Sequence, residues 1–264
     1  MAYTKLTPHY TPGAHVEEIS HGNEYRLIIP AGPADKYRVS QLDDYTKTIR
    51  GRFPLRPPLN LSLSARASSE SIPGTWGFGL WNDPFGLSLG FGGNLFRLPA
   101  LPNAVWFFGA SKESYLSFKD ASSSLRSAPL AGTSQFEAAN GFLAQTFRSP
   151  KFHLLLILAG LALPFSRKLT RRFLGKVIGE DGIALSVNVT QWHKYKLDWR
   201  EERVSFEVDD VQVFDSQVSP KPPLGLVIWI DNQYAKFTPK GKIGFGVLEN
   251  PEPEWLEIKD LELR

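Results

Sequence analysis

Cysteine is absent from the 264-residue sequence, and methionine occurs only once. Without cysteine the chain cannot form disulfides, cannot use a thiolate as a nucleophile and cannot build a cysteine-based metal site. This composition suits a cytosolic protein and is also compatible with secretion. The absence of cysteine therefore excludes thiol chemistry without assigning a compartment.

Long apolar segments are also missing. No apolar run approaches the roughly 18 to 20 residues that cross a bilayer as a helix, and the stretch Met1-Ala2-Tyr3-Thr4-Lys5 begins no apolar core of a signal peptide. We therefore expect a cytoplasmic protein. The sequons at Asn60 and Asn188 are then expected to be chance matches.

Charge of one sign is not concentrated along the chain. The sequence has 30 Lys and Arg against 27 Asp and Glu, a formal net charge of +3 at pH 7. Nucleic-acid binders usually present a concentrated basic face, and only one short basic stretch occurs here, between Arg167 and Lys176. We expect no nucleic-acid partner.

Sequence motifs for metals and cofactors are lacking as well. The five histidines form no i, i+4 pair and no H-E-x-x-H motif. There is no G-x-S-x-G motif and no phosphate-binding G-x-x-x-x-G-K-S/T. The stretch Gly77-Phe78-Gly79 lacks the third glycine and the helix of a dinucleotide site. We expect neither a metal nor a cofactor.

Aromatic and turn residues are abundant, with seven Trp, 18 Phe, 22 Gly and 20 Pro. In 195–199 and 204–208 apolar and polar residues alternate, which is typical of half-buried strands. The acidic pair Asp209-Asp210 then separates the second strand from 211–214. The passage predicts a β-meander and, with the many turn residues, an all-β protein.

Further strands are expected at 24–29, 61–67, 76–81, 104–110, 224–230, 242–248 and 255–263. The segment at about 152–181 differs: an apolar run over 154–165 precedes basic residues and a helical repeat of apolar residues. Ser166 is expected to cap this helix and Gly179 to end it. No internal repeat is evident, so we expect a single domain, 1–264, with a basic amphipathic helical insertion.

The meander also resembles a known signature. Trp192 to Trp199 reads W-H-x-Y-x-x-x-W, and 204–210 reads V-x-F-x-V-D-D. This resembles the concanavalin A-like lectin and glucanase superfamily, especially glycoside hydrolase family 16. The resemblance implies a jelly-roll β-sandwich of two antiparallel sheets with a concave binding face. It also implies that His193 belongs to the scaffold.

In family 16, catalysis uses carboxylates on one strand in a pattern like E-x-D-x-x-E. The strand that the resemblance matches to it is 102–110, where Ala104, Trp106 and either Phe108 or Gly109 replace the acids. Hydrolysis of the family 16 type is therefore not expected. Whether the protein is an enzyme stays open.

The resemblance instead predicts an aromatic concave cleft. Its floor would be formed by Trp76, Trp81, Trp106, Phe108 and Trp229, and its rim by Asn82, Asp83, Asp231, Asn232, Gln233 and Tyr234. Rings stack on sugars and on hydrophobic ligands, while the rim offers donors and acceptors. The alternatives are that the rings fill a closed core and that the two polar segments are ordinary turns.

Three functions are compatible with these features. The first is non-hydrolytic binding of a hydrophobic molecule or glycoconjugate in the aromatic cleft. The second is an enzyme of other chemistry, such as cyclisation, isomerisation or elimination, with Asp231 or Asp83 as acid or base at a burial-raised pKa. The third is a module that contacts a membrane surface or partner through the helical insertion; its basic residues are Arg167, Lys168, Arg171 and Arg172. The insertion could equally be a lid or an ordinary solvated helix.

Overall fold

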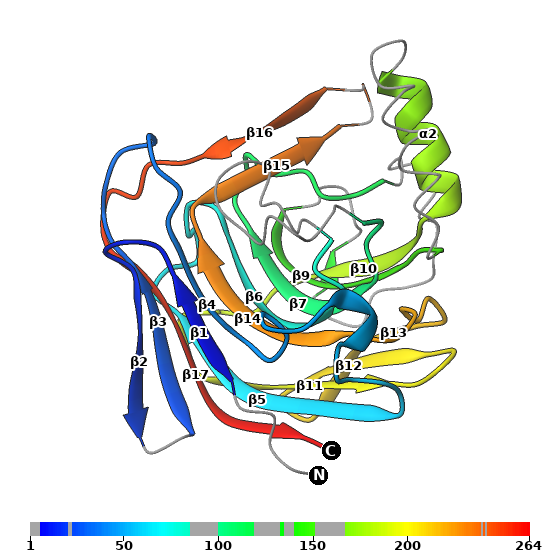
Figure 1. Ribbon diagram of the computed structural model, residues 1–264, viewed down its shortest axis with the longest axis horizontal. Helices are drawn as coiled ribbons and strands as arrows, with labels where there is room; N and C mark the ends of the chain where they lie inside the picture. The colour runs from blue at the N-terminus through cyan, green and yellow to red at the C-terminus, as the bar shows by residue number, and fades with distance from the viewer. Residues whose placement is uncertain are drawn as a thin grey trace.

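The computed structural model describes residues 6–20, 23–84, 100–118, 133–134, 140–150, 167–238, 240 and 242–264, with the backbone alone for 133–134 and 167–169. These residues form two large sheets that face each other (Figure 1). Every strand pairing between the named strands is antiparallel. The predicted sandwich of two antiparallel sheets is confirmed.

The first sheet contains, in spatial order, β1 (Thr7–Tyr10), β4 (Val39–Asp43), β14 (Gly225–Asp231), β6 (Thr75–Trp81), β7 (Ala104–Ala110), β9 (Gly141–Arg148), β10 (Gly179–Leu185) and β8 (Thr133–Ser134). The second contains β13 (Val211–Ser216), β12 (Val204–Val208), β11 (His193–Trp199), β5 (Leu59–Ala67), β17 (Glu254–Leu263), β3 (Glu24–Ile29) and β2 (His15–Ser20). A separate hairpin joins β15 (Gln233–Phe237) and β16 (Ile243–Val247), and a short 3-10 helix, η1, spans Arg50–Arg52.

The meander predicted at 193–216 is β11, β12 and β13. Residues Tyr195, Leu197 and Trp199 of β11 are buried, and the residues between them are partly exposed. The turn between β12 and β13 is Asp209-Asp210, and both residues adopt left-handed φ angles, 51° and 64°. Two such residues fit the right-handed twist of the flanking strands. The alternation thus places one face of the meander in the core.

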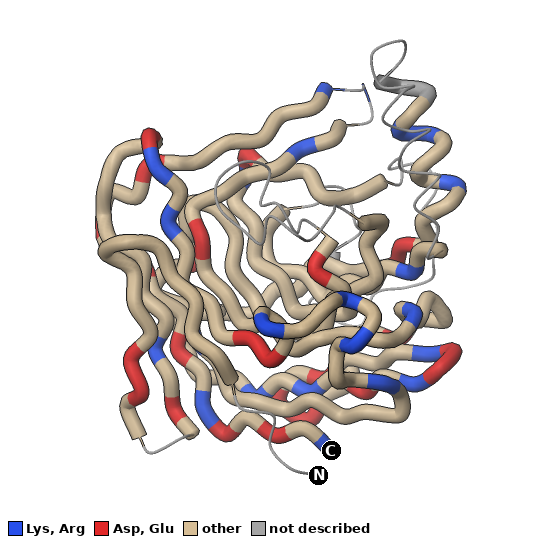
Figure 2. Tube along the Cα trace, viewed as in Figure 1, with Lys and Arg blue, Asp and Glu red and all other residues tan. Residues whose placement is uncertain are grey.

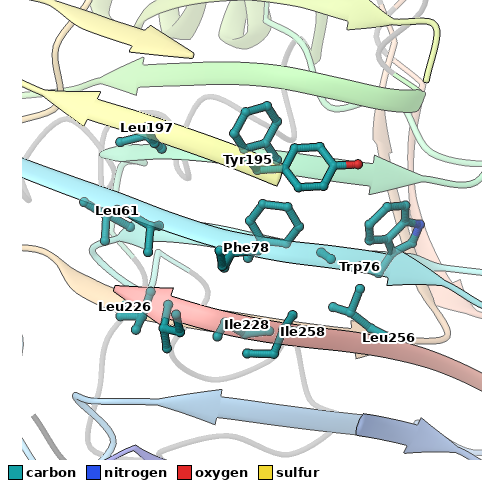
Figure 3. Packing of buried hydrophobic residues seen from close by; sticks show 14 of the residues in the cluster. Leu61, Trp76, Phe78, Tyr195, Leu197, Leu226, Ile228, Leu256 and Ile258 are labelled. Atoms are coloured by element: carbon teal, nitrogen blue, oxygen red, sulfur yellow. The ribbon is translucent and has the colours of Figure 1, made fainter. Parts of the chain in front are cut away.

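The main core lies between the two sheets and is rich in rings. Phe78 and Tyr195 come from opposite sheets, and their ring centroids lie 5.1 Å apart (Figure 3). Phe107 meets Phe206 edge to face at 5.2 Å. Such pairs add a specific geometry to ordinary apolar burial. This core fixes which face of each strand points inward.

The first sheet is buried on both faces. All seven residues of β7 and all seven of β14 are buried, and a second apolar cluster covers the face turned away from the second sheet. The central strands of this sheet are nearly free of charge, whereas charged residues gather on the second sheet and on the loops (Figure 2). We call the covered face the concave face, because the strands curve around it (Figure 1).

The helix predicted in the insertion is α2 (Arg167–Val177). It ends two residues before Gly179, where β10 begins, so the last residues of the segment expected at about 152–181 belong to a strand. The reason is that residues 179–184 pair with β9 and extend the first sheet. The apolar run 154–165 and the expected cap at Ser166 lie outside the described residues. Among the described residues, no helix is both long and apolar enough to cross a membrane.

Candidate functional site

Four aromatic residues come together on the concave face: Trp81, Trp106, Phe108 and Trp229, here called the aromatic cluster. Trp81 and Trp229 stack with a centroid distance of 6.0 Å and an interplanar angle of 6°. Trp106 lies 6.0 Å from Trp81 and 5.8 Å from Trp229. Trp106, Phe108 and Trp229 are at most 6% exposed, whereas Trp81 is partly exposed. The cluster is therefore reached from solvent mainly at Trp81.

Two glycines of β6 make room for these rings. Gly77 pairs with Trp229, and Gly79 pairs with Trp106. A Cβ atom on Gly77 would lie 3.0 Å from Cη2 of Trp229, and one on Gly79 would lie 2.6 Å from Cα of Trp106. A Cβ atom on Gly77 would also lie 2.3 Å from the carbonyl oxygen of Phe107, so either added methyl group would require a shift of the structure. Gly77 and Gly79 thus leave the space in which the tryptophan rings pack on this face.

The prediction that Trp76 shares this floor is wrong. Trp76 lies on the opposite face of β6, in the core between the sheets (Figure 3). Its ring stacks on Phe142 with centroids 5.1 Å apart and an interplanar angle of 8°. The physical reason is the period of two along a strand, which puts residues five apart on opposite faces. Trp76 and Trp81 therefore cannot contact one ligand from the same side.

Asp231 ends β14 beside the aromatic cluster and is held by a network of hydrogen bonds. The hydroxyl of Thr75 donates to Oδ1 at 2.8 Å, the amide of Gln233 donates at 3.0 Å, and the hydroxyl of Tyr37 donates to Oδ2 at 3.3 Å. The indole Nε1 of Trp229 donates in turn to Thr75 at 3.1 Å. A hydrogen-bonded chain thus runs from the cluster to this carboxylate.

Burial raises the pKa of Asp231 to about 6, although the hydrogen bonds from Thr75 and Gln233 oppose the shift. Burial also raises the pKa of Tyr37 well above its usual value, and the neighbouring charge of Asp231 adds to the effect. Desolvation disfavours the charged form of both groups. Asp231 can therefore exist in both protonation states near neutral pH.

The polar residues after Asp231 mostly hold loops together. Asn232 is fully buried; its Oδ1 accepts from the amide of Arg38 at 2.8 Å, and its Nδ2 donates to the carbonyls of Lys36 and Leu248 at 3.0 and 2.8 Å. Gln233 and Tyr234 begin β15 and are partly exposed. The polar atoms of the Asn232 side chain thus all form hydrogen bonds to the backbone. This favours the interpretation of the segment as a strand end over that of a ligand-binding rim.

The segment after β6 is a turn. Nδ2 of Asn82 donates to the carbonyl of Leu101 at 2.9 Å, and its Oδ1 accepts from the amide of Asn103 at 3.0 Å. The guanidinium of Arg50 donates to the carbonyls of Asn82 and Asp83, and Asp83 has a left-handed φ of 49°. These contacts favour the interpretation of this segment as a turn. In it, Asn82 connects the end of β6 to the segment of Leu101 and Asn103.

Asp83 and Asp231 do not come together. Asp231 pairs with Thr75 at the first residue of β6, whereas Asp83 follows Trp81 at the last. At about 3.3 Å per residue, six residues of strand put these ends roughly 20 Å apart. The two carboxylates therefore cannot act on the same bond as an acid and base pair.

Other polar residues of the concave face, among them Gln145 and Glu180, were not predicted from the sequence. Gln145 of β9 is fully buried; its Oε1 accepts from Nε1 of Trp106 at 3.3 Å, and its Nε2 donates to the carbonyl of Leu116 at 3.2 Å. Glu180 of β10 is also buried and accepts from the amide of Phe118 at 2.7 Å. Residues 142–144 are all apolar, so 142–148 shows no alternation of apolar and polar residues that would predict a buried Gln145.

The carboxylates that the structure describes on this face, Asp43, Asp231 and Glu180, are widely separated. Asp43 of β4 is fully buried and lies four residues along the strand from Val39, the partner of Asp231, which is roughly 13 Å at about 3.3 Å per residue. The order β14-β6-β7-β9-β10 puts four strand spacings between Asp231 and Glu180, which is roughly 19 Å at about 4.8 Å per spacing. The concave positions of β7 hold Ala104, Trp106, Phe108 and Ala110. Among the described residues no group of three or more His, Asp or Glu could hold a metal ion.

The basic residues of α2 do not form one solvent-facing surface. Arg171 is buried, and its guanidinium donates to the carbonyl of Phe237 at 2.9 Å and to that of Ser117 at 3.0 Å. The prediction that Arg171 belongs to an exposed basic face is therefore wrong, because a loop and β15 pack over it. Arg172 is exposed. Arg167 and Lys168 lie in the helix, but their side chains fall outside the described part of the chain.

Comparison with known proteins gives similarity in structure only. No protein-family model and no curated protein matches the sequence. The structure is similar to a glycoside hydrolase family 16 endo-glucanase from Bacteroides ovatus, at 10% identity and a TM-score of 0.47 over 100% of this chain and 96% of that one. It is similar to LamAcat from Zobellia galactanivorans, at 16% identity and a TM-score of 0.45 over 90% and 76%.

A third similar structure is a legume lectin-like domain from Entamoeba histolytica, at 11% identity and a TM-score of 0.45 over 98% of this chain and 89% of that one.

Proposed function

We propose that the protein is a non-hydrolytic binding protein that holds a hydrophobic molecule or a glycoconjugate against the aromatic cluster. The observation that carries this proposal is the convergence of three tryptophan rings within 6.0 Å of one another, with Trp81 partly exposed. Flat apolar rings with a few polar groups beside them are typical of sites for such ligands.

Hydrolysis by paired carboxylates is not part of this proposal. Retaining and inverting glycosidases need two carboxyl groups about 5 to 9.5 Å apart. Asp231 and Glu180 are separated by four strand spacings, and β7, which runs between them, has no acidic residue. The geometry therefore supports binding better than hydrolysis of a glycosidic bond.

The test is a binding screen with glycans and lipids, comparing wild type with Trp81→Ala. Trp81 is the informative position because it is partly exposed, whereas emptying the buried site of Trp229 would cost about 3–5 kcal/mol in stability. Trp192→Ala is the matched control, because Trp192 is a partly exposed tryptophan whose ring is packed under Lys259, a residue of the second sheet.

We expect Trp81→Ala to weaken binding about tenfold or more, which corresponds to about 1.4 kcal/mol of lost contact. Trp192→Ala should bind like wild type, and circular dichroism should show that both variants are folded. Equal affinity of Trp81→Ala and wild type for every ligand that binds would refute the assignment of the site.

A second candidate function rests on Asp231, whose pKa burial raises to about 6. In this proposal Asp231 acts as an acid or base on a ligand bound at the aromatic cluster. Asp231→Asn preserves the shape of the side chain and removes the titration. Turnover of a bound ligand by wild type and not by this variant, with an inflection near pH 6, would support catalysis; equal turnover would exclude it.

A further inference from the structure

A cavity of about 250 Å³ lies outside the aromatic cluster, at the loops that connect the two sheets. Three of its lining residues are basic, namely Arg56, Arg148 and Lys221, and the acidic residue Glu201 lies beside them. Ser219 and three prolines complete the lining. Lys and Arg also recur at and around η1 in this part of the molecule (Figure 2).

The three basic residues come from segments far apart in the sequence. Arg56 follows η1, Arg148 is the last residue of β9, and Lys221 lies between β13 and β14. None of the three forms an ion pair with any carboxylate that the structure describes. Arg56 and Arg148 are exposed and Lys221 is partly exposed, so all three side chains can be reached from solvent. Three cations and one carboxylate leave a net charge of +2 at the cavity, which attracts an anion.

The walls of the cavity are joined by buried hydrogen bonds. Oδ1 of Asn103 accepts from the amide of Ser149 at 3.0 Å and from the amide of Lys221 at 2.9 Å, and Nδ2 of Asn103 donates to the carbonyl of Ser149 at 3.1 Å. One buried asparagine thus fixes the segment after Arg148 against the segment of Lys221.

The segment of Arg56 is tied to the same frame. Leu55 and Leu224 exchange two backbone hydrogen bonds, 3.0 and 3.1 Å long. Nη1 of Arg56 donates to the carbonyl of Phe53 at 3.3 Å, which leaves its other guanidinium donors for a ligand. The backbones that carry the three cations are therefore held in place before any ligand arrives, which reduces the cost of binding.

We propose that this basic cavity binds one oxyanion group, a sulfate, phosphate or carboxylate, carried by a small ligand. Guanidinium groups match the geometry of such groups through paired N–H donors, and the lysine adds a point charge. Glu201 repels the anion and can accept a hydrogen bond from a hydroxyl or amine of the same ligand. This site is independent of the binding function proposed for the concave face.

The experiment titrates the whole chain with sodium phosphate, sodium sulfate and sodium acetate at constant ionic strength, followed by NMR of the backbone amides. Saturable shifts at the amides of Ser149 and Lys221 are expected with at least one anion, and the order of the three anions identifies the group. Affinity should fall as sodium chloride is raised. No saturable shift at these amides with any of the three anions would overturn the proposal.

Variants separate the cavity from general surface charge. Arg148→Gln and Lys221→Gln should each weaken binding about tenfold, because each removes a charge-assisted bond. Arg264→Gln is the control, since Arg264 is exposed and pairs with Glu262 at 2.8 Å. Equal affinity of the cavity variants and this control would contradict the proposal.

The affinity of Glu201→Gln for the anion distinguishes the proposed site from a folding defect. Removal of this carboxylate should tighten binding of the anion, whereas a damaged fold could only weaken it. Trp81→Ala should leave anion binding unchanged, so failure here is distinguishable from failure of the function proposed for the aromatic cluster. Weaker or unchanged anion binding by Glu201→Gln would contradict the role assigned to the cavity.

Discussion

The hydroxyl of Thr75 donates a 2.8 Å hydrogen bond to Oδ1 of Asp231, and the two residues lie opposite each other at the ends of β6 and β14. Through Thr75 the carboxylate is connected to the indole of Trp229. A change in the charge of Asp231 therefore alters the hydrogen-bonded chain that ends at Trp229, at the edge of the aromatic cluster. The pH dependence of stability is the direct way to observe it.

The first prediction concerns this pH dependence. The pKa of Asp231 is about 6 in the folded protein against the usual 3.8, so between these values the folded state holds the proton more tightly than the unfolded state. Protonated Asp231 therefore stabilises the folded state. This contribution to the free energy of unfolding is fully present below about pH 4 and is lost as the pH rises through 6. The loss is roughly 3 kcal/mol in the free energy of unfolding.

Urea denaturation of wild type and Asp231→Asn at pH 4, 5, 6 and 7 measures this loss. Asparagine can keep the bonds from Thr75 and Gln233 without the charge, so the variant should be relatively more stable at pH 7 than at pH 4. Asp44, whose pKa burial raises to about 7, titrates in both proteins and cancels in the comparison. Parallel stability profiles for the two proteins would show that Asp231 titrates normally.

The second prediction concerns the glycines beneath the rings. Gly79→Ala would place a Cβ atom 2.4 Å from the carbonyl oxygen of Val105 and 2.6 Å from Cα of Trp106. Because both neighbours are backbone atoms in a fully buried strand, they cannot move aside cheaply. We expect a loss of about 1–3 kcal/mol in the free energy of unfolding.

Gly51→Ala is the control for that loss, because a Cβ atom at Gly51 would meet no other atom within 4 Å. Its stability should stay within about 0.5 kcal/mol of wild type. Thermal and chemical denaturation of the two variants measures the difference. Similar stability of Gly79→Ala and Gly51→Ala would mean that the rings and the strand adapt to the added methyl group.

The third prediction concerns the attachment of α2. Arg171→Ala removes two hydrogen bonds from a buried guanidinium, to Phe237 and Ser117. It leaves their carbonyls without a charged donor, and we expect a loss of about 2–4 kcal/mol. Arg172→Ala, at an exposed position on the next residue, should cost no more than about 0.5 kcal/mol.

Hydrogen exchange of the amides in α2 is the local measurement for this prediction. Protection of the helix should fall in Arg171→Ala and persist in Arg172→Ala, because the hydrogen bonds to Phe237 of β15 and to Ser117 come from Arg171. Equal protection in both variants would show that apolar packing alone holds the helix.

Local patterns in the sequence predicted the meander well. Along 195–208 the alternation of apolar and polar residues decides both the strand and its buried face, and Asp209-Asp210 supplies the left-handed turn. The same rule already separates Trp76 from Trp81, since their spacing is odd. The local sequence does not tell which of these two tryptophans points toward the second sheet, because β6 is apolar on both of its faces.

The pairings between distant segments were decided only by the tertiary structure. Gln145 meets Trp106 because β9 pairs with β7, and Arg171 is buried because β15 and a loop pack over one face of α2. The basic cavity joins Arg56, Arg148 and Lys221 across 165 residues of chain. A sequence determines strands, turns and their faces because these depend on neighbours along the chain, whereas the partners of each face depend on contacts that form only when the sheets close.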